Sequence, residues 1–215
     1  MTPGDQLLAG MQRLERTGLN QGTSGNLSVR TPDGFLVTPS GVPVERLQAE
    51  DMVPMDLDGN AHGRLHPSSE WRMHRDLYTA FPHAQAVAHA HPPHATALAC
   101  CREGIPSFHY MVAVAGGHDI RCADYATFGT AELSANAVVA LQGRKACLLA
   151  NHGTLCHGTD LERAIALAVE VETLARQYLL ARQHGAPVLL DEAEMGRVIE
   201  RFKTYGKQPG MEKQA

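Results

Sequence analysis

Two histidines close together in the chain could hold one metal ion. His89 and His91 form the HAH segment of VAHAHPP, and the alternating pattern from Gln85 to His91 predicts a strand. Residues two apart on a strand project to the same face, so both imidazoles could bind the same ion. The same pattern is compatible with a pair of surface histidines on a half-buried strand.

A third histidine, His152, follows the apolar run KACLLA in the segment NHG. An imidazole at a strand end, beside a glycine, can reach a site at the edge of a sheet. Taken alone, the segment is more typical of a histidine in a turn between a strand and a helix. Together, three histidine ligands leave one coordination position open, which is the arrangement of a catalytic rather than a structural zinc site.

The segment PSSEW places a carboxylate and two hydroxyls at a predicted helix start. Ser68, Ser69 and Glu70 precede a pattern that predicts a helix to about Phe81. A helix N-terminus offers free N–H groups and a partial positive charge, so hydroxyls there favour phosphate binding. The simpler interpretation is an ordinary helix cap formed by Ser68 or Ser69.

Two further loops are rich in hydroxyls and exposed N–H groups, namely TSGN at 23–26 and TPSG at 38–41. Both strengthen the phosphate interpretation, although each could be a plain turn. Neither matches a P-loop or a GxGxxG fingerprint, so a nucleotide ligand is not indicated.

The chain contains only four lysines, and three of them lie in its last 13 residues. An aldolase stabilises the carbanion left by C–C cleavage either through a Schiff-base lysine or through a metal that polarises the carbonyl. If the reaction is aldol chemistry, the scarcity of lysine favours the metal route.

Strands and helices interleave along the chain, which predicts a mixed α/β fold of three layers, with helices on both faces of a central sheet. We expect one domain over 1–215, with 206–215 as a flexible tail. The predicted strands are a hairpin over 27–38 and runs at 85–91, 110–115 and 145–150. The predicted helices run from the N-terminus to Gly18, over about 70–81 and 94–101, after Thr130, over 161–184 and after Asp191.

Composition narrows the classes of protein that fit. A formal net charge of -4 gives no reason to expect a nucleic-acid partner. The chain lacks a signal-peptide pattern and a long apolar run, so we expect no membrane association and a cytoplasmic location. Five cysteines without CxxC spacing make a disulfide framework or a cysteine zinc site improbable.

Eight segments in order resemble motifs of the class II aldolase/adducin family: GLNQGTSGNLSVR, LVTPSG, PSSEW, HAH, IPSFHYM, YATFGT, NHG and FKTYG. The similarity spans about Asp5 to Gly206 and is closest to the L-fuculose-1-phosphate aldolases of this family. It implies a mainly antiparallel sheet and a zinc enzyme that cleaves a ketose 1-phosphate reversibly into dihydroxyacetone phosphate and an aldehyde. It also implies a four-fold symmetric homotetramer with sites between subunits and one zinc ion per subunit.

The resemblance also implies roles for individual residues. His89, His91 and His152 match the zinc ligands, and Glu70 matches the catalytic acid/base. Tyr110 matches a tyrosine that enters the neighbouring subunit's site as a proton donor. The residues that match the phosphate-binding loops are Thr23, Gly25, Asn26, Ser40, Gly41, Ser68 and Ser69, and those that match the aldehyde side are Phe128 and Tyr205.

Alternatives remain within the family. The epimerases carry an aspartate where Glu70 stands, and adducin-like members tend to lose the zinc histidines, which this chain keeps. One alternative is an aldolase or dehydratase that acts on 5-methylthioribulose 1-phosphate or another sugar phosphate. A second is a non-enzymatic, adducin-like assembly module.

Overall fold

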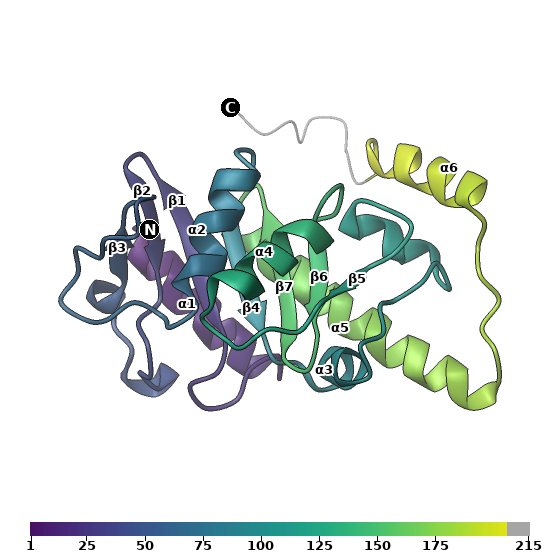
Figure 1. Cartoon of the computed structure of the whole chain (residues 1–215), viewed down its shortest axis with the longest axis horizontal. Helices are drawn as coiled ribbons and strands as arrows, with labels where there is room; N and C mark the ends of the chain where they lie inside the picture. The colour runs from purple at the N-terminus through teal and green to yellow at the C-terminus, as the bar shows by residue number, and fades with distance from the viewer. Residues whose placement is uncertain (206–215) are drawn as a thin grey trace.

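The computed structural model describes residues 1–205 and contains one seven-stranded sheet (Figure 1). The predicted flexible tail at 206–215 lies outside the described residues, and the assignment of 1–215 to one domain stays a prediction. The strands are β1 (Asn26–Thr31), β2 (Gly34–Val37), β3 (Val53–Met55), β4 (Ala86–Ala90), β5 (Arg121–Ala123), β6 (Ala146–Leu149) and β7 (Gly153–Gly158).

Strand order in the sheet is β3-β2-β1-β4-β7-β6-β5. All neighbouring strands are antiparallel except β5 and β6, which run parallel. The predicted mainly antiparallel sheet is therefore confirmed. The α-helices are α1 (Pro3–Arg16), α2 (Trp71–Ala80), α3 (Pro93–Cys100), α4 (Ala131–Ala140), α5 (Leu161–His184) and α6 (Glu192–Phe202), and the 3-10 helices are η1 (Val44–Arg46), η2 (Ala49–Asp51) and η3 (Tyr110–Ala115).

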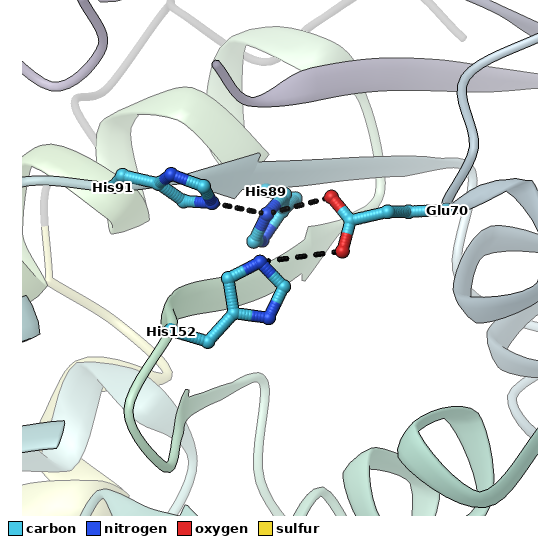
Figure 2. A group of neighbouring side chains, drawn as sticks. All are labelled: Glu70, His89, His91 and His152. Atoms are coloured by element: carbon cyan, nitrogen blue, oxygen red, sulfur yellow. Dashed lines mark hydrogen bonds and ion pairs between the residues drawn. The ribbon is translucent and has the colours of Figure 1, made fainter. Parts of the chain in front are cut away.

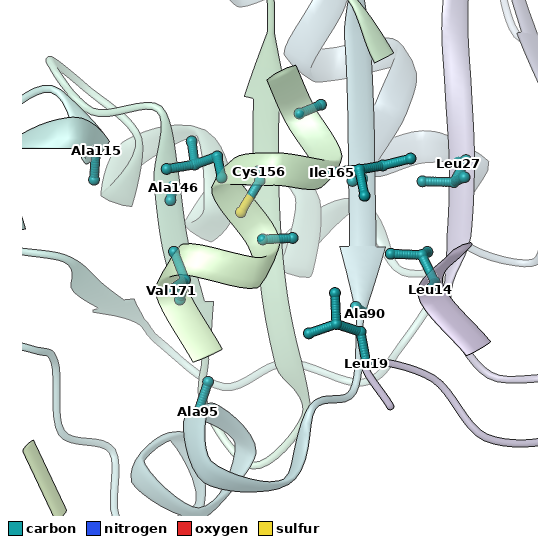
Figure 3. Packing of buried hydrophobic residues seen from close by; sticks show 14 of the residues in the cluster. Leu14, Leu19, Leu27, Ala90, Ala95, Ala115, Ala146, Cys156, Ile165 and Val171 are labelled. Atoms are coloured by element: carbon teal, nitrogen blue, oxygen red, sulfur yellow. The ribbon is translucent and has the colours of Figure 1, made fainter. Parts of the chain in front are cut away.

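Alternating residues of the central strands feed two separate apolar clusters. Ala86, Ala88 and Ala90 of β4 pack in the cluster that includes residues of α1, α3 and α5 (Figure 3). Val87 points to the other face, where the cluster includes residues of α2 and α4. Because side chains alternate along a strand, the sheet is covered on both faces, and the predicted three-layer fold is confirmed. The small alanines on one face leave room for α5 to lie close to β4.

Side chains at the starts of several helices explain where these helices begin. Thr2 and Asp5 form a capping box at α1, in which Asp5 N donates to Thr2 Oγ1 at 3.1 Å and Thr2 N donates to Asp5 Oδ2 at 2.8 Å. The side chains of Asp160 and Asp191 accept from N–H groups in the first turns of α5 and α6. These caps satisfy N–H groups that a helix start leaves free.

One predicted strand is wrong. Residues 110–115 form the 3-10 helix η3, and the ring of His109 accepts a hydrogen bond from Met111 N at its start. The apolar run YMVAVA carries no period that separates a short strand from a helix. Three short strands, β3, β5 and β7, were not predicted. Within residues 1–205, no helix is both long and apolar enough to cross a membrane.

Candidate active site

His89 lies fully buried near the end of β4, on the face of the sheet that α2 covers. Its Nδ1 lies 2.8 Å from the carbonyl oxygen of Thr154 on the neighbouring strand β7. A carbonyl only accepts hydrogen bonds, so Nδ1 carries the hydrogen, and in the neutral ring Nε2 keeps its lone pair. This hydrogen bond orients the ring and leaves Nε2 as a metal-binding atom.

His91 follows β4 directly, and its Nε2 lies 2.9 Å from Nε2 of His89 (Figure 2). A Cβ on Gly153 would lie 2.4 Å from the carbonyl oxygen of Ala90 and 2.8 Å from Cδ2 of His91. The His91 ring occupies the space that a side chain at 153 would need. His91 N also donates to Asn20 Oδ1 at 3.2 Å, which ties the end of β4 to the loop that precedes β1.

His152 stands in the turn that joins β6 to β7, so the turn links two strands rather than a strand and a helix. Asn151 before it takes a left-handed conformation with φ 55°, and His152 N donates to the carbonyl of Leu149 at 3.0 Å. Asparagine tolerates this conformation better than most residues. The ring centroids of His89, His91 and His152 lie 4.8 Å apart in every pair.

Glu70 is the residue before α2, and its carboxylate points at the histidines rather than capping its own helix. Oε2 lies 3.0 Å from His89 Nε2, and Oε1 lies 3.3 Å from His152 Nε2 without accepting a hydrogen bond. The alternative interpretation, that Ser68 or Ser69 caps this helix, is wrong, because the cap position belongs to Glu70. Ser68 Oγ instead accepts from Glu70 N at 3.3 Å.

This donor set fits a divalent metal ion. The ligand atoms of Glu70, His89, His91 and His152 all lie within 4.8 Å of one another. Tetrahedral zinc with Zn–N bonds of about 2.0–2.1 Å places its nitrogen ligands about 3.3 Å apart. The distance of 2.9 Å between Nε2 of His89 and Nε2 of His91 is close to that value. Glu70 Oε1 is a buried oxygen without a hydrogen-bond partner, so it too can bind an ion. The residues can therefore hold an ion with little rearrangement.

The protonation states of the site are compatible with a cation. Burial, aided by the charge that His89 carries when no cation is bound, lowers the pKa of His91 to about 3 and that of His152 to about 4, so both rings are neutral. Burial would lower the pKa of His89 too, but the Glu70 carboxylate beside it raises that pKa, and a metal ion would displace the proton from Nε2 on binding. Burial alone would raise the pKa of Glu70, but the charges of His89 and His152 and the hydrogen bonds it accepts bring it below its usual range. Neutral imidazoles and an ionised carboxylate are the forms that ligate metals.

A cavity of about 350 Å³ opens beside this cluster. All seven residues expected at the phosphate line it, as do Glu70, His91, His152 and Phe128. The structure therefore brings together segments from the start of β1, the loop after β2 and the start of α2. Five further lining residues lie in the quoted motifs, but the sequence had assigned them no individual role: Ser24, Pro39, Tyr125, Ala126 and Asn151.

Tyr110 and Tyr205 do not line this cavity. Tyr110 begins η3 and stacks on His109, at 4.8 Å between ring centroids, and on Phe202 of α6, at 6.3 Å. Tyr205 meets Phe202 edge-on. The two tyrosines are 50% and 78% exposed. Their expected roles at a subunit boundary stay predictions.

Comparison with known proteins of similar sequence and fold identifies the family of this chain. The sequence profile of the class II aldolase and adducin N-terminal domain matches residues 5–179. A 5-methylthioribulose-1-phosphate/5-deoxyribulose-1-phosphate aldolase of Rhodospirillum rubrum is 53% identical over 200 residues, covering 93% of this chain and 90% of its own. An L-fuculose phosphate aldolase of Escherichia coli K12 is 50% identical over 204 residues, covering 94% of each chain.

A solved structure of an L-fuculose 1-phosphate aldolase superimposes with a TM-score of 0.91 at 44% identity, covering 94% of this chain and 96% of its own. The chain therefore belongs to the class II aldolase and adducin family. Within that family it is an enzyme, a metal-dependent aldolase of the aldehyde-lyase class, as its sequence predicted.

Proposed function

We propose that this aldolase binds one zinc ion per subunit through His89, His91 and His152 and cleaves a ketose 1-phosphate reversibly into dihydroxyacetone phosphate and an aldehyde. One observation supports this most directly: the histidine nitrogens, the Glu70 carboxylate and the hydroxyl-rich loops meet at one cavity. Imidazole ligands suit zinc, which polarises a carbonyl without redox chemistry.

The phosphate end of the substrate is proposed to lie between the loops 23–26, 40–41 and 68–69. Among the described residues, the hydroxyls of Ser40 and Ser69 make no hydrogen bond to the protein, so they are free to donate to a phosphate. Within residues 1–205, no lysine or arginine lines the cavity. Binding would therefore depend on hydroxyls, backbone N–H groups and the N-terminus of α2.

The chemistry proposed for the chain's own residues is proton transfer. A bound zinc ion would act as a Lewis acid on the substrate carbonyl. In condensation the ionised Glu70 would remove the proton from the carbon that becomes the nucleophile. In cleavage Glu70 would take up a proton from solvent and pass it to the same carbon, which keeps the bonding electrons when the C–C bond breaks. Its carboxylate suits this role because it is buried beside the histidines and is held by the Asn26 Nδ2 at 3.1 Å.

In condensation the aldehyde oxygen needs a separate proton donor, for which we propose Tyr110 of a neighbouring subunit in a four-fold symmetric homotetramer. In cleavage the hydroxyl that becomes the aldehyde carbonyl would return its proton to the same tyrosine. Its ring is half exposed and stands away from its own chain's cavity. Phe128, at the cavity rim, and Tyr205 are proposed to shape the aldehyde side. Such a tetramer, working without membrane or nucleic-acid partners, is proposed to act in the cytoplasm.

The leading substrate is one like L-fuculose 1-phosphate. The Rhodospirillum relative favours a second candidate, 5-methylthioribulose 1-phosphate or 5-deoxyribulose 1-phosphate. All three compounds share the dihydroxyacetone phosphate portion and differ in the aldehyde released. The residues at the metal and the phosphate therefore do not discriminate among them, and the discrimination falls to the aldehyde side.

The test incubates the full-length, zinc-loaded protein with each of these ketose 1-phosphates. Release of dihydroxyacetone phosphate is measured by coupling it to the oxidation of NADH. The preferred substrate is the one with the highest kcat/KM. A dehydratase would consume 5-methylthioribulose 1-phosphate without releasing dihydroxyacetone phosphate. An adducin-like module would release none from any compound and would bind zinc below one equivalent, and either result would contradict the proposal.

A further inference from the structure

Behind Glu70, a chain of buried polar side chains runs between β1 and α2, and the proposed reaction uses none of its members beyond Asn26. Asn26 and Ser28 lie two apart on β1, and His74 and Tyr78 lie four apart on α2. Two strand residues span about 6.6 Å and four helix residues about 6 Å, so the two pairs can face each other in register. All four side chains are at most 4% exposed.

Four hydrogen bonds link these side chains to one another and to the Glu70 carboxylate. Asn26 Nδ2 donates to Glu70 Oε2 at 3.1 Å, and Asn26 Oδ1 lies 2.5 Å from His74 Nε2. His74 Nδ1 lies 2.6 Å from Ser28 Oγ, which lies 2.7 Å from the Tyr78 hydroxyl. The buried ends of the chain are thus Glu70 at the cavity and Tyr78 in the apolar cluster under α2.

The chemistry of the groups fixes the direction of every hydrogen bond. An ionised carboxylate only accepts, so Asn26 must turn its Nδ2 toward Glu70 and its Oδ1 toward His74. His74 must then donate from Nε2 and accept at Nδ1, so Ser28 donates its hydroxyl hydrogen to His74 and Tyr78 donates to Ser28. Burial raises the pKa of Tyr78, which keeps its hydroxyl protonated. Burial, aided by charge on His89, lowers the pKa of His74 to about 3, which keeps this ring neutral.

We propose that His74 is a positioning residue: its Nε2–H, held by the hydroxyls of Ser28 and Tyr78, fixes the amide of Asn26 so that Nδ2 faces Glu70. This role rests on the proposed function of Glu70 as the acid/base. An amide nitrogen carries two hydrogens, and Asn26 also lines the cavity. A flipped amide would turn its oxygen toward the carboxylate and toward a bound phosphate, and both contacts would be repulsive.

The first test measures the tautomer of His74 directly. Imidazole nitrogen NMR spectra of the full-length protein are recorded at neutral pH, without metal and with zinc. The resonances of His74 are those missing from the His74→Gln variant. The expected result is a neutral ring protonated at Nε2. A ring protonated at Nδ1 would overturn the proposal, because Nε2 would then have nothing to donate to Asn26.

The second test is kinetic and uses the substrate found for the wild type. His74→Phe keeps the ring volume and removes both hydrogen bonds, and we expect kcat/KM to fall about tenfold or more, the usual loss for a partner of an active-site group. Both a lower kcat and a higher KM are expected, with zinc content unchanged. A loss of folded protein alone would lower the apparent kcat and leave KM as it was.

Three variants separate positioning from general stability. His74→Gln should recover most of the activity, because a glutamine amide nitrogen can take the place of Nε2. Tyr78→Phe should cost less, since Ser28 still donates to His74. His157→Phe is the matched control: His157 is another histidine, 2% exposed, and it stacks on Phe81 away from the cavity. It should keep kinetics close to wild type.

A folded, zinc-loaded His74→Phe protein with wild-type kcat and KM would overturn the proposal, and so would a His74→Gln protein as impaired as His74→Phe. If His74→Phe does not fold, the glutamine variant and the tautomer decide. If the wild type releases dihydroxyacetone phosphate from none of the ketose 1-phosphates, the proposed function fails. The NMR measurement still decides whether His74 donates from Nε2 to Asn26.

Discussion

The imidazole of His91 packs directly against Gly153, where a Cβ would lie only 2.8 Å from His91 Cδ2. The two residues come from different segments of the chain, since His91 follows β4 and Gly153 begins β7, which pairs with β4. The glycine of the NHG segment therefore leaves room for the second histidine of the HAH segment. The close approach lets His91 turn its Nε2 toward that of His89 directly after the strand ends.

We predict that Gly153→Ala weakens zinc binding and destabilises the protein. The new Cβ would meet the backbone oxygen of Ala90, which cannot move without disturbing the sheet. Such overpacking costs about 1–3 kcal/mol. Calorimetry with and without zinc should show a lower Tm and a smaller gain on adding the metal. The matched control is Gly196→Ala, in the open interior of α6, where alanine should stabilise slightly. Equal behaviour of the two variants would contradict the prediction.

We predict that zinc stabilises the folded wild type and that His91→Ala loses most of this effect. A ligand that binds only the folded state adds about 2.7 kcal/mol when present at a hundred times its Kd. For a chain of this size that gain raises Tm by roughly 5–10 °C. Thermal melts at several zinc concentrations, with metal analysis after dialysis, measure both effects. His118→Ala removes a half-exposed histidine outside the cluster and should behave as wild type. A zinc response that survives in His91→Ala would remove this residue from the metal site.

We predict that Ser69→Ala weakens phosphate binding more than Ser24→Ala does, although both residues line the cavity. The Ser24 hydroxyl is already engaged, since it donates to the carbonyl of Gln21 at 2.7 Å and accepts from Gln21 N at 3.2 Å. Within the described residues, the Ser69 hydroxyl has no such partner. Hydrogen bonds to charged groups contribute about 1.5–3 kcal/mol, so KM for the sugar phosphate should rise about tenfold or more in Ser69→Ala.

The inhibition constant of inorganic phosphate, which shares only this end of the substrate, provides the check. It should rise in parallel with KM in Ser69→Ala. An unchanged constant would place the phosphate elsewhere in the cavity.

Much of this site could be predicted from the sequence, because each piece is a short local motif. The HAH spacing predicted two imidazoles on one side of a strand, and the structure places His89 in β4 and His91 directly after it. Local patterns did not reveal that Glu70 turns away from its own helix toward His89, since that depends on how α2 packs over β4. His74 gave no signal at all, because its partners Asn26 and Ser28 lie more than 40 residues away.

The apolar run 110–115 shows a second limit. Its composition suits a strand, yet the residues form η3, which packs against α5 and α6. Tertiary packing decides between strand and helix when a run is too short to show a period. Because the run forms η3 and not a strand, Tyr110 stands half exposed at the first position of this helix.

We predict that Tyr110 acts in the site of a neighbouring subunit, and mixed oligomers test this directly. Alone, Glu70→Gln should keep zinc and lose about a hundredfold or more of kcat, and Tyr110→Phe should slow turnover without changing the fold. Each site is expected to combine Glu70 of one subunit with Tyr110 of its neighbour. When the two variants mix equally and at random, half of the subunits keep Glu70, and half of the neighbours of those subunits keep Tyr110. Randomly mixed oligomers should therefore recover about a quarter of wild-type activity.

The two variants are co-expressed with different tags, and oligomers that carry both tags are purified and assayed. A mixture of two separately purified variants is the control and should show only the sum of their residual rates. If Tyr110 acted within its own subunit, each site would keep one defect and no activity would return on mixing. That result, or a Tyr110→Phe protein that runs at the wild-type rate, would exclude the tyrosine as a donor across the subunit boundary.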